Sequence, residues 1–221
     1  MLSPLFWLLP VVFLSFGFGQ LFKWSQRKHH SAPVVIATNY LVLAGCLFGY
    51  FALSGDLTFG WQVLQVGIIT GLFFIASMLT MTYALTRIDS APTLTSFRLA
   101  VVLPIFAGAF LWDEAVTGRQ VAGFAAAIAS LFLLTWRTDS ESKGNKLYLV
   151  AMIFILQGIS MCCLHWVHHA GLDEHRLHVL MVTAATAGIL GSFFVMLRSI
   201  PLRSDALLAG AGIGIFNLLA L

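Results

Sequence analysis

Arg98 is the side chain best suited to chemistry in this 221-residue sequence, because it places a charge inside an apolar segment. It lies near the centre of residues 91–112, where a charge costs roughly 2.5–3.5 kcal/mol on membrane-insertion scales. Two interpretations stay open. Arg98 is either the counter-charge for an anionic substrate such as a carboxylate, or it reaches the nearer interface or a helix-end carbonyl. No acidic residue lies deep in the other apolar segments, which favours a substrate anion or water.

Three uncharged polar side chains lie deep in other apolar segments, namely Asn39, Gln157 and Asn217. Each either orients a substrate through hydrogen bonds or bonds to a neighbouring helix. Together with Arg98 they form the predicted substrate-binding set. The sequence predicts no catalytic residue, no cofactor and no metal ligand.

Five histidines lie between positions 165 and 178. Three of them, His165, His168 and His169, match the H-x-x-H-H pattern of membrane di-iron desaturases, which need several separated histidine boxes. The other two histidines of the chain are the adjacent pair His29 and His30. A polar loop at the membrane interface is therefore the favoured interpretation, with adventitious zinc or a pH-sensitive loop as alternatives.

Composition places these residues in a membrane protein, because 59% of the chain is hydrophobic and 10% is charged. A soluble domain carries about 25% charged residues, so a soluble enzyme is excluded. The 12 basic and 9 acidic residues are scattered, and no basic run predicts a nucleic-acid partner. The three cysteines are predicted to be small packing residues.

Eight apolar segments approach the length of about 20 residues that a membrane-spanning helix needs. All six tryptophans fall near their ends, where indole rings prefer the membrane–water interface. The predicted spans are 4–22, 33–54, 60–86, 91–112, 118–136, 147–167, 177–197 and 205–221. The odd-numbered connections hold nine lysines and arginines and the even-numbered ones hold two, which predicts cytoplasmic odd loops and an external N-terminus.

The chain repeats itself weakly at an offset of about 142–143 residues. Residues 67–74 correspond to 210–217, and both copies keep two glycines four apart, which allows helices to approach closely. The predicted units are a five-span repeat over 1–137, a connecting loop over 138–146, and an incomplete second repeat over 147–221. An odd number of spans inverts the second copy, and inverted repeats with a site at their interface are a transporter architecture.

The predicted fold is therefore an all-α integral membrane bundle of inverted five-helix repeats, with eight of ten spans present. Leu221 lies inside an apolar run, so we expect this chain to be a fragment. A chain that ends there would need a homodimer to complete the carrier.

The stretch 112–123 resembles the drug/metabolite transporter superfamily, and its EamA-like family in particular. That family ends its fourth span with Glu, followed by Ser or Thr, Gln and Gly at three-residue steps. Here those residues are Glu114, Thr117, Gln120 and Gly123. The resemblance extends over the whole chain by span order but has motif character only over about 80–136. It implies ten helices in two inverted halves, alternating access around a central cavity, and transport of small organic solutes.

The sequence also departs from the family pattern. Val101 stands where members usually carry a proline, and Pro104 follows about one turn later. Pro104 is predicted to kink the helix six residues after Arg98. Small multidrug members carry an acidic residue in their first span, and residues 4–22 contain none. That difference argues against proton-coupled cation antiport.

The motif has a physical interpretation that does not depend on the family. Thr117 is predicted to cap the helix that starts at residue 118, and Glu114 lies near the positive end of that helix. Glu114 is therefore predicted to be a structural loop residue rather than a substrate or proton site.

These observations predict a secondary carrier, not an enzyme, that moves a small organic metabolite across the cell (inner) membrane, an anion being one candidate. One alternative is a non-transporting membrane protein that binds or regulates a partner. A histidine-metal membrane enzyme is the remote alternative.

Overall fold

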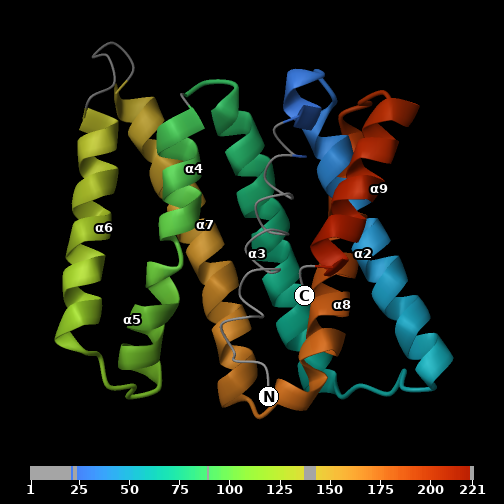
Figure 1. The fold of residues 1–221 in the computed structure, drawn as a ribbon, viewed down its shortest axis with the longest axis horizontal. Coiled ribbons are helices and arrows are strands. Elements are labelled where there is room, and N and C mark those ends of the chain that lie inside the picture. The colour runs from blue at the N-terminus through green and yellow to red at the C-terminus, as the bar shows by residue number, and fades with distance from the viewer. Residues whose placement is uncertain (1–20, 22–23, 89, 137–142, 220–221) are drawn as a thin grey trace, which may run out of the picture. The chain divides into compact units, whose positions relative to one another are not determined.

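The computed structural model of the protein describes residues 21, 24–88, 90–136 and 143–219. The predicted first span, 4–22, lies outside the described residues apart from Leu21, as do residues 137–142. The helices, labelled in Figure 1, are α2 (Ala32–Ser54), α3 (Trp61–Leu85), α4 (Ser90–Leu99), α5 (Val102–Leu111), α6 (Gly118–Trp136), α7 (Lys143–His169), α8 (Arg176–Leu197) and α9 (Ser204–Leu219). A short 3-10 helix, Asp173–His175, precedes α8.

Five helical segments among the described residues are long and apolar enough to cross a membrane: Ala32–Ser54, Trp61–Leu85, Pro92–Leu111, Leu147–His169 and Asp173–Leu197. The third of these combines α4 and α5. Their surfaces carry large apolar side chains such as Leu53 and Phe110, which are 92% and 81% exposed. Extensive exposed apolar surface is stable in lipid but not in water. The prediction of a helical membrane protein is confirmed, while the count of eight spans and the inverted repeats stay predictions.

The segment predicted as one span over 91–112 is broken into α4 and α5 at Ala100 and Val101. Pro104 has no N–H to donate to the carbonyl of Ala100, four residues earlier. The N–H of Leu103 donates to that carbonyl instead, at 3.1 Å, which tightens the chain into a turn. The kink predicted from Pro104 is confirmed, and the break that it produces begins at Ala100, two residues after Arg98.

The chain divides into two compact units. Unit 1 consists of Met1–Ile68 and Leu177–Leu221, and unit 2 consists of Ile69–Arg176. Among the described helices, α2, α8 and α9 belong to unit 1, and α4 to α7 belong to unit 2, with the boundary inside α3. The predicted division at 138–146 rests on the sequence repeat and stays a prediction.

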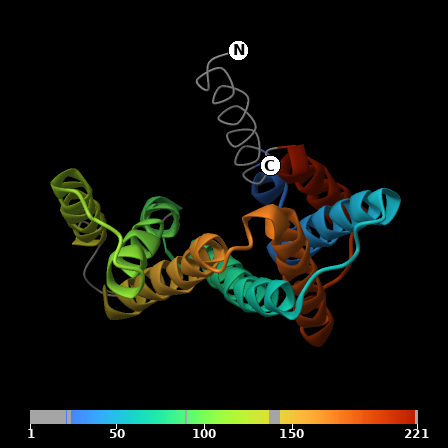
Figure 2. The same cartoon turned by 90° about the horizontal axis from the view of Figure 1, so that it is seen from below.

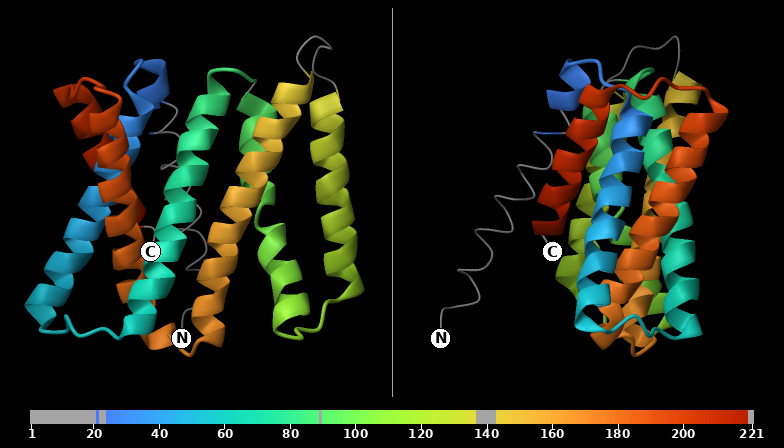
Figure 3. Two further views of the ribbon diagram at one scale, coloured as in Figure 1. Left: turned by 180° about the vertical axis from the view of Figure 1, so that it is seen from behind. Right: turned by 90° about the vertical axis from the view of Figure 1, so that its right-hand side faces the viewer.

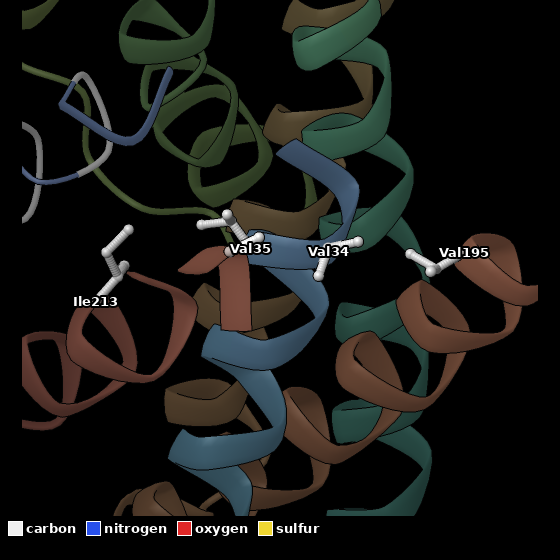
Figure 4. Packing of buried hydrophobic residues seen from close by; sticks show 5 residues of the cluster. Val34, Val35, Val195 and Ile213 are labelled. Carbon is white, nitrogen blue, oxygen red and sulfur yellow. The ribbon is translucent and has the colours of Figure 1, made fainter. Parts of the chain in front are cut away.

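In unit 1, α9 packs closely along α2 (Figures 2 and 3). Their contact continues into a core of Val34, Val35, Val195, Ala206 and Ile213 (Figure 4). Gly210 and Gly214 lie on the face of α9 that meets α2. A Cβ at either glycine would come within 2.8 Å of a backbone carbonyl oxygen of α2. The close approach predicted for this glycine pair is therefore confirmed.

His178 joins the C-terminal end of α2, the connection after it and the start of α8. Its ring is buried and stacks on Phe51, with ring centroids 3.8 Å apart. Its Nε2 donates a hydrogen bond to the backbone carbonyl of Asp56 at 2.9 Å. The His178 side chain thus connects α8 to the end of α2 by ring stacking and to the following connection by a hydrogen bond.

Replacing His178 with alanine is expected to destabilise the protein by about 2–3 kcal/mol, because the change removes a buried ring and its hydrogen bond. A loss of that size lowers the thermal unfolding midpoint by about 5 °C or more for a chain of this length. Scanning fluorimetry in detergent measures it. The control is Leu177→Ala, since Leu177 is exposed. An equal fall for both variants would contradict the role given to His178.

Candidate functional site

Gln157 occupies a buried polar position between α3 and α7 in unit 2. It is fully buried, and its Oε1 accepts a hydrogen bond of 2.6 Å from the Ser77 hydroxyl. Its Nε2 has no hydrogen-bond partner among the described residues. One turn further along α7, the Ser160 hydroxyl donates to the backbone carbonyl of Thr70 at 3.5 Å. These residues form a line of polar groups inside two apolar helices.

A buried donor without a partner costs about 1–3 kcal/mol. Because lipid supplies no acceptor, the amide of Gln157 is suited to bind an acceptor that enters the protein. A carboxylate or carbonyl oxygen of a small molecule has the required chemistry. Of the residues predicted for the substrate site, Gln157 therefore has the strongest local support.

Arg98 lies in the last turn of α4, two residues before the helix break, and its side chain is exposed. Within the described residues no carboxylate pairs with it. The neighbouring Ser96 hydroxyl donates to the backbone carbonyl of Val150 on α7 at 2.6 Å, which anchors this turn of α4. The guanidinium of Arg98 therefore extends from a helix end that is anchored to α7, and it is exposed.

Asn39 and Asn217 belong to unit 1. Asn39, on α2, is buried, and its Oδ1 has no partner among the described residues. Asn217, on α9, is partly exposed. Unit 2 holds Arg98 and Gln157, and the prediction that all four residues share one substrate site stays a prediction.

A second cluster in unit 2 joins Glu114 to two histidines. His165 and His169 lie one turn apart at the end of α7, and Glu114 lies in the connection between α5 and α6. Figure 1 shows that connection and the C-terminal end of α7 at the same lower end of unit 2. Oε1 of Glu114 accepts hydrogen bonds from Nε2 of His165 at 2.9 Å and from Nε2 of His169 at 2.7 Å.

The surrounding residues position this cluster. The indole of Trp112 stacks on the His169 ring, with centroids 4.4 Å apart and an interplanar angle of 5°. The N–H of Glu114 donates to the carbonyl of Gly108 at 3.1 Å. A Cβ on Gly108 would overlap Oε2 of Glu114, so a side chain at this position would displace the carboxylate. Asp113, the residue before Glu114, adopts a left-handed backbone conformation, with φ of 52°.

Hydrogen bonds from His169 and His165 hold the pKa of the Glu114 carboxyl below its ordinary value. Glu114 is therefore ionised at neutral pH and carries a full negative charge beside the two imidazoles. The sequence predicted a structural loop residue near the positive end of α6. In the structure its carboxylate contacts α7.

Thr117 and Gln120 of the motif bond to each other. The Thr117 hydroxyl accepts the N–H of Gln120 at 3.4 Å, and Oε1 of Gln120 accepts the N–H of Thr117 at 2.7 Å. This reciprocal pair is a capping box at the start of α6. The predicted capping role of Thr117 is confirmed.

The H-x-x-H-H pattern does not converge as a unit. His168 is exposed and bonds to Asp173 at 2.8 Å, while His165 and His169 point to Glu114. The signal in the sequence was the spacing of four between His165 and His169, which puts two imidazoles on one helix face. No spacing pointed to Glu114, which lies 51 residues before His165.

The long apolar helices of the described residues define a helical membrane protein. The chain matches no protein-family model, no curated protein and no solved structure. The resemblance to the EamA-like family therefore stays a prediction.

Proposed function

We propose that the protein is a secondary carrier that moves a small, carboxylate-bearing metabolite across the cell (inner) membrane by alternating access. The observation that carries this proposal is the buried amide of Gln157, whose Nε2 has no partner among the described residues. A polar group inside membrane helices is costly and commonly serves a substrate pathway. The amide would donate to a carboxylate oxygen of the substrate.

Two features of unit 2 support the same function. The break between α4 and α5 leaves a discontinuous apolar helix, and transporters build substrate sites from such helices. Arg98, on the turn before that break, supplies a positive charge for an anionic substrate. The resemblance of residues 112–123 to the EamA-like family agrees with transport of small organic solutes.

Uptake into proteoliposomes tests the proposal. We expect purified protein to take up at least one of labelled glutamate, alanine and lactate faster than protein-free liposomes do, and to discriminate against the amine cadaverine. Gln157→Leu is expected to lower that uptake at least about tenfold, because a hydrogen bond to a charged group contributes about 1.5–3 kcal/mol.

The matched control is Gln65→Leu, which removes an exposed amide from α3. Both variants are compared for monodispersity and thermal midpoint before transport is measured. No uptake of any of the three carboxylates would reject the carrier. Equal uptake by Gln157→Leu and the wild type would reject Gln157 as a substrate ligand.

A further inference from the structure

We propose that Glu114, His165 and His169 bind one divalent zinc-class cation at the C-terminal end of α7. This inference is independent of the carrier function. It rests on side chains that belong to one unit of the fold and on distances between their ligand atoms.

The ligand types suit zinc and its neighbours among the transition metals. Imidazole nitrogen and carboxylate oxygen are both common zinc ligands, and two histidines with one glutamate form a recurring three-ligand set. The spacing of four between His165 and His169 puts their rings on one face of α7. The third ligand comes from a separate element, which allows the set to surround an ion.

The distances are close to those that an ion requires. The three ligand atoms lie within 4.8 Å of one another. A tetrahedral zinc site with bonds near 2.0–2.1 Å separates its ligand atoms by about 3.3 Å. The contacts from Oε1 of Glu114, at 2.9 and 2.7 Å, need only small side-chain adjustments to admit the ion. Each imidazole would then carry its proton on Nδ1.

The neighbouring residues restrict the ligands before any ion arrives. Trp112 packs flat on His169 and edge-on to His165, whose centroid lies 5.4 Å away. Gly108 leaves the space that the Glu114 carboxylate occupies, because a side chain there would overlap it. Groups that hold ligands in orientation strengthen metal binding. Trp112 and Gly108 thus help to keep the ligand atoms of the three side chains close together.

Charge and access also favour a cation. The side chains of Glu114, His165 and His169 are 40%, 33% and 23% exposed, so an ion can enter from solvent. The Glu114 carboxylate supplies a negative charge that attracts a divalent cation. Three protein ligands leave a further coordination position for water. The bound ion would cross-link the α5–α6 connection to the end of α7.

Zinc titration of the full chain tests this proposal. The protein is purified without a polyhistidine tag, stripped with a chelator, and titrated with ZnCl₂ by isothermal calorimetry. We expect one zinc per chain and no competition from Mg²⁺, which prefers oxygen ligands. Co²⁺ in place of zinc is expected to give the visible absorption of a tetrahedral site.

Variants separate a built site from incidental binding. His165→Ala and Glu114→Gln are each expected to weaken zinc binding at least tenfold, since even residues behind the ligands commonly contribute that much. His168→Ala is the matched control, because His168 bonds to Asp173 instead. Gly108→Ala keeps all three ligands but displaces the Glu114 carboxylate, and is expected to weaken binding as well.

The thermal midpoint gives a second measurement that identifies variants that fail to fold. Zinc is expected to raise the midpoint of the wild type and of His168→Ala, and to leave that of His165→Ala unchanged. The proposal is overturned if His168→Ala weakens binding as much as His165→Ala, or if Glu114→Gln binds zinc as tightly as the wild type. Failure of zinc to bind the wild type would overturn it equally.

Discussion

Replacing Gly210 with leucine is expected to force α9 away from α2 and to lower the thermal midpoint of the protein by about 5 °C or more. A Cβ at this position would lie 2.8 Å from the carbonyl oxygen of Val35 and 2.7 Å from Cβ of Thr38. The backbone cannot move aside as a flexible side chain can. Overpacking costs about 1–3 kcal/mol, and a loss of that size shifts the midpoint by about 2–4 °C per kcal/mol.

The same helix offers a matched control. Gly212 lies between Gly210 and Gly214, and a Cβ there would meet nothing within 4 Å. Gly212→Leu should therefore leave the midpoint within about 2 °C of the wild type, whereas Gly214→Leu should behave like Gly210→Leu. Scanning fluorimetry in detergent compares the three variants. Equal midpoints for Gly210→Leu and Gly212→Leu would contradict the close contact between α9 and α2.

Arg98→Gln is expected to abolish carboxylate uptake while the protein keeps its fold. Arg98 is exposed and pairs with no carboxylate among the described residues, so its removal leaves no buried partner unsatisfied. Under the proposed function the guanidinium provides the positive charge that the substrate carboxylate meets. Losing a charged hydrogen bond of about 1.5–3 kcal/mol lowers uptake at least about tenfold.

Arg87→Gln provides the control for this substitution. Arg87 follows the end of α3, is exposed, and lies over the ring of Tyr83 at 5.3 Å. It belongs to the same unit but lies outside the membrane-spanning segments. Proteoliposome uptake at matched protein density compares the two variants. Uptake by Arg98→Gln at the wild-type rate would remove Arg98 from the substrate site and leave Gln157 as the candidate.

Local sequence determined the helices of this protein. Apolar runs of sufficient length predicted α2, α3, α7 and α8, because the backbone in lipid must satisfy its own hydrogen bonds within a helix. Pro104 predicted the break between α4 and α5, because proline has no N–H to donate to the carbonyl four residues earlier in the helix. Thr117 predicted the start of α6 as its cap. The structure adds Gln120, three residues later, as its partner in a capping box.

For some site residues the sequence identified the residue itself but not the residue or helix that it contacts. The depth of Gln157 in an apolar segment marked it as a candidate, yet its bond to Ser77 joins residues 80 positions apart. The glycine pair at 210 and 214 predicted close helix contact, yet the sequence did not identify α2 as the neighbour. Periodicity shows which face of a helix carries polar or small residues, but it does not show which other helix packs against that face.

Only the tertiary structure joined Glu114 to His165 and His169. The interactions that sequence patterns report act over three or four residues, because that is the reach of a helical turn or a cap. The contact between this carboxylate and the two imidazoles spans more than 50 residues and depends on how α5 and α7 pack. By itself the sequence determined an all-helical membrane protein with polar residues in its spans, and the packing of its helices decided which of those residues meet.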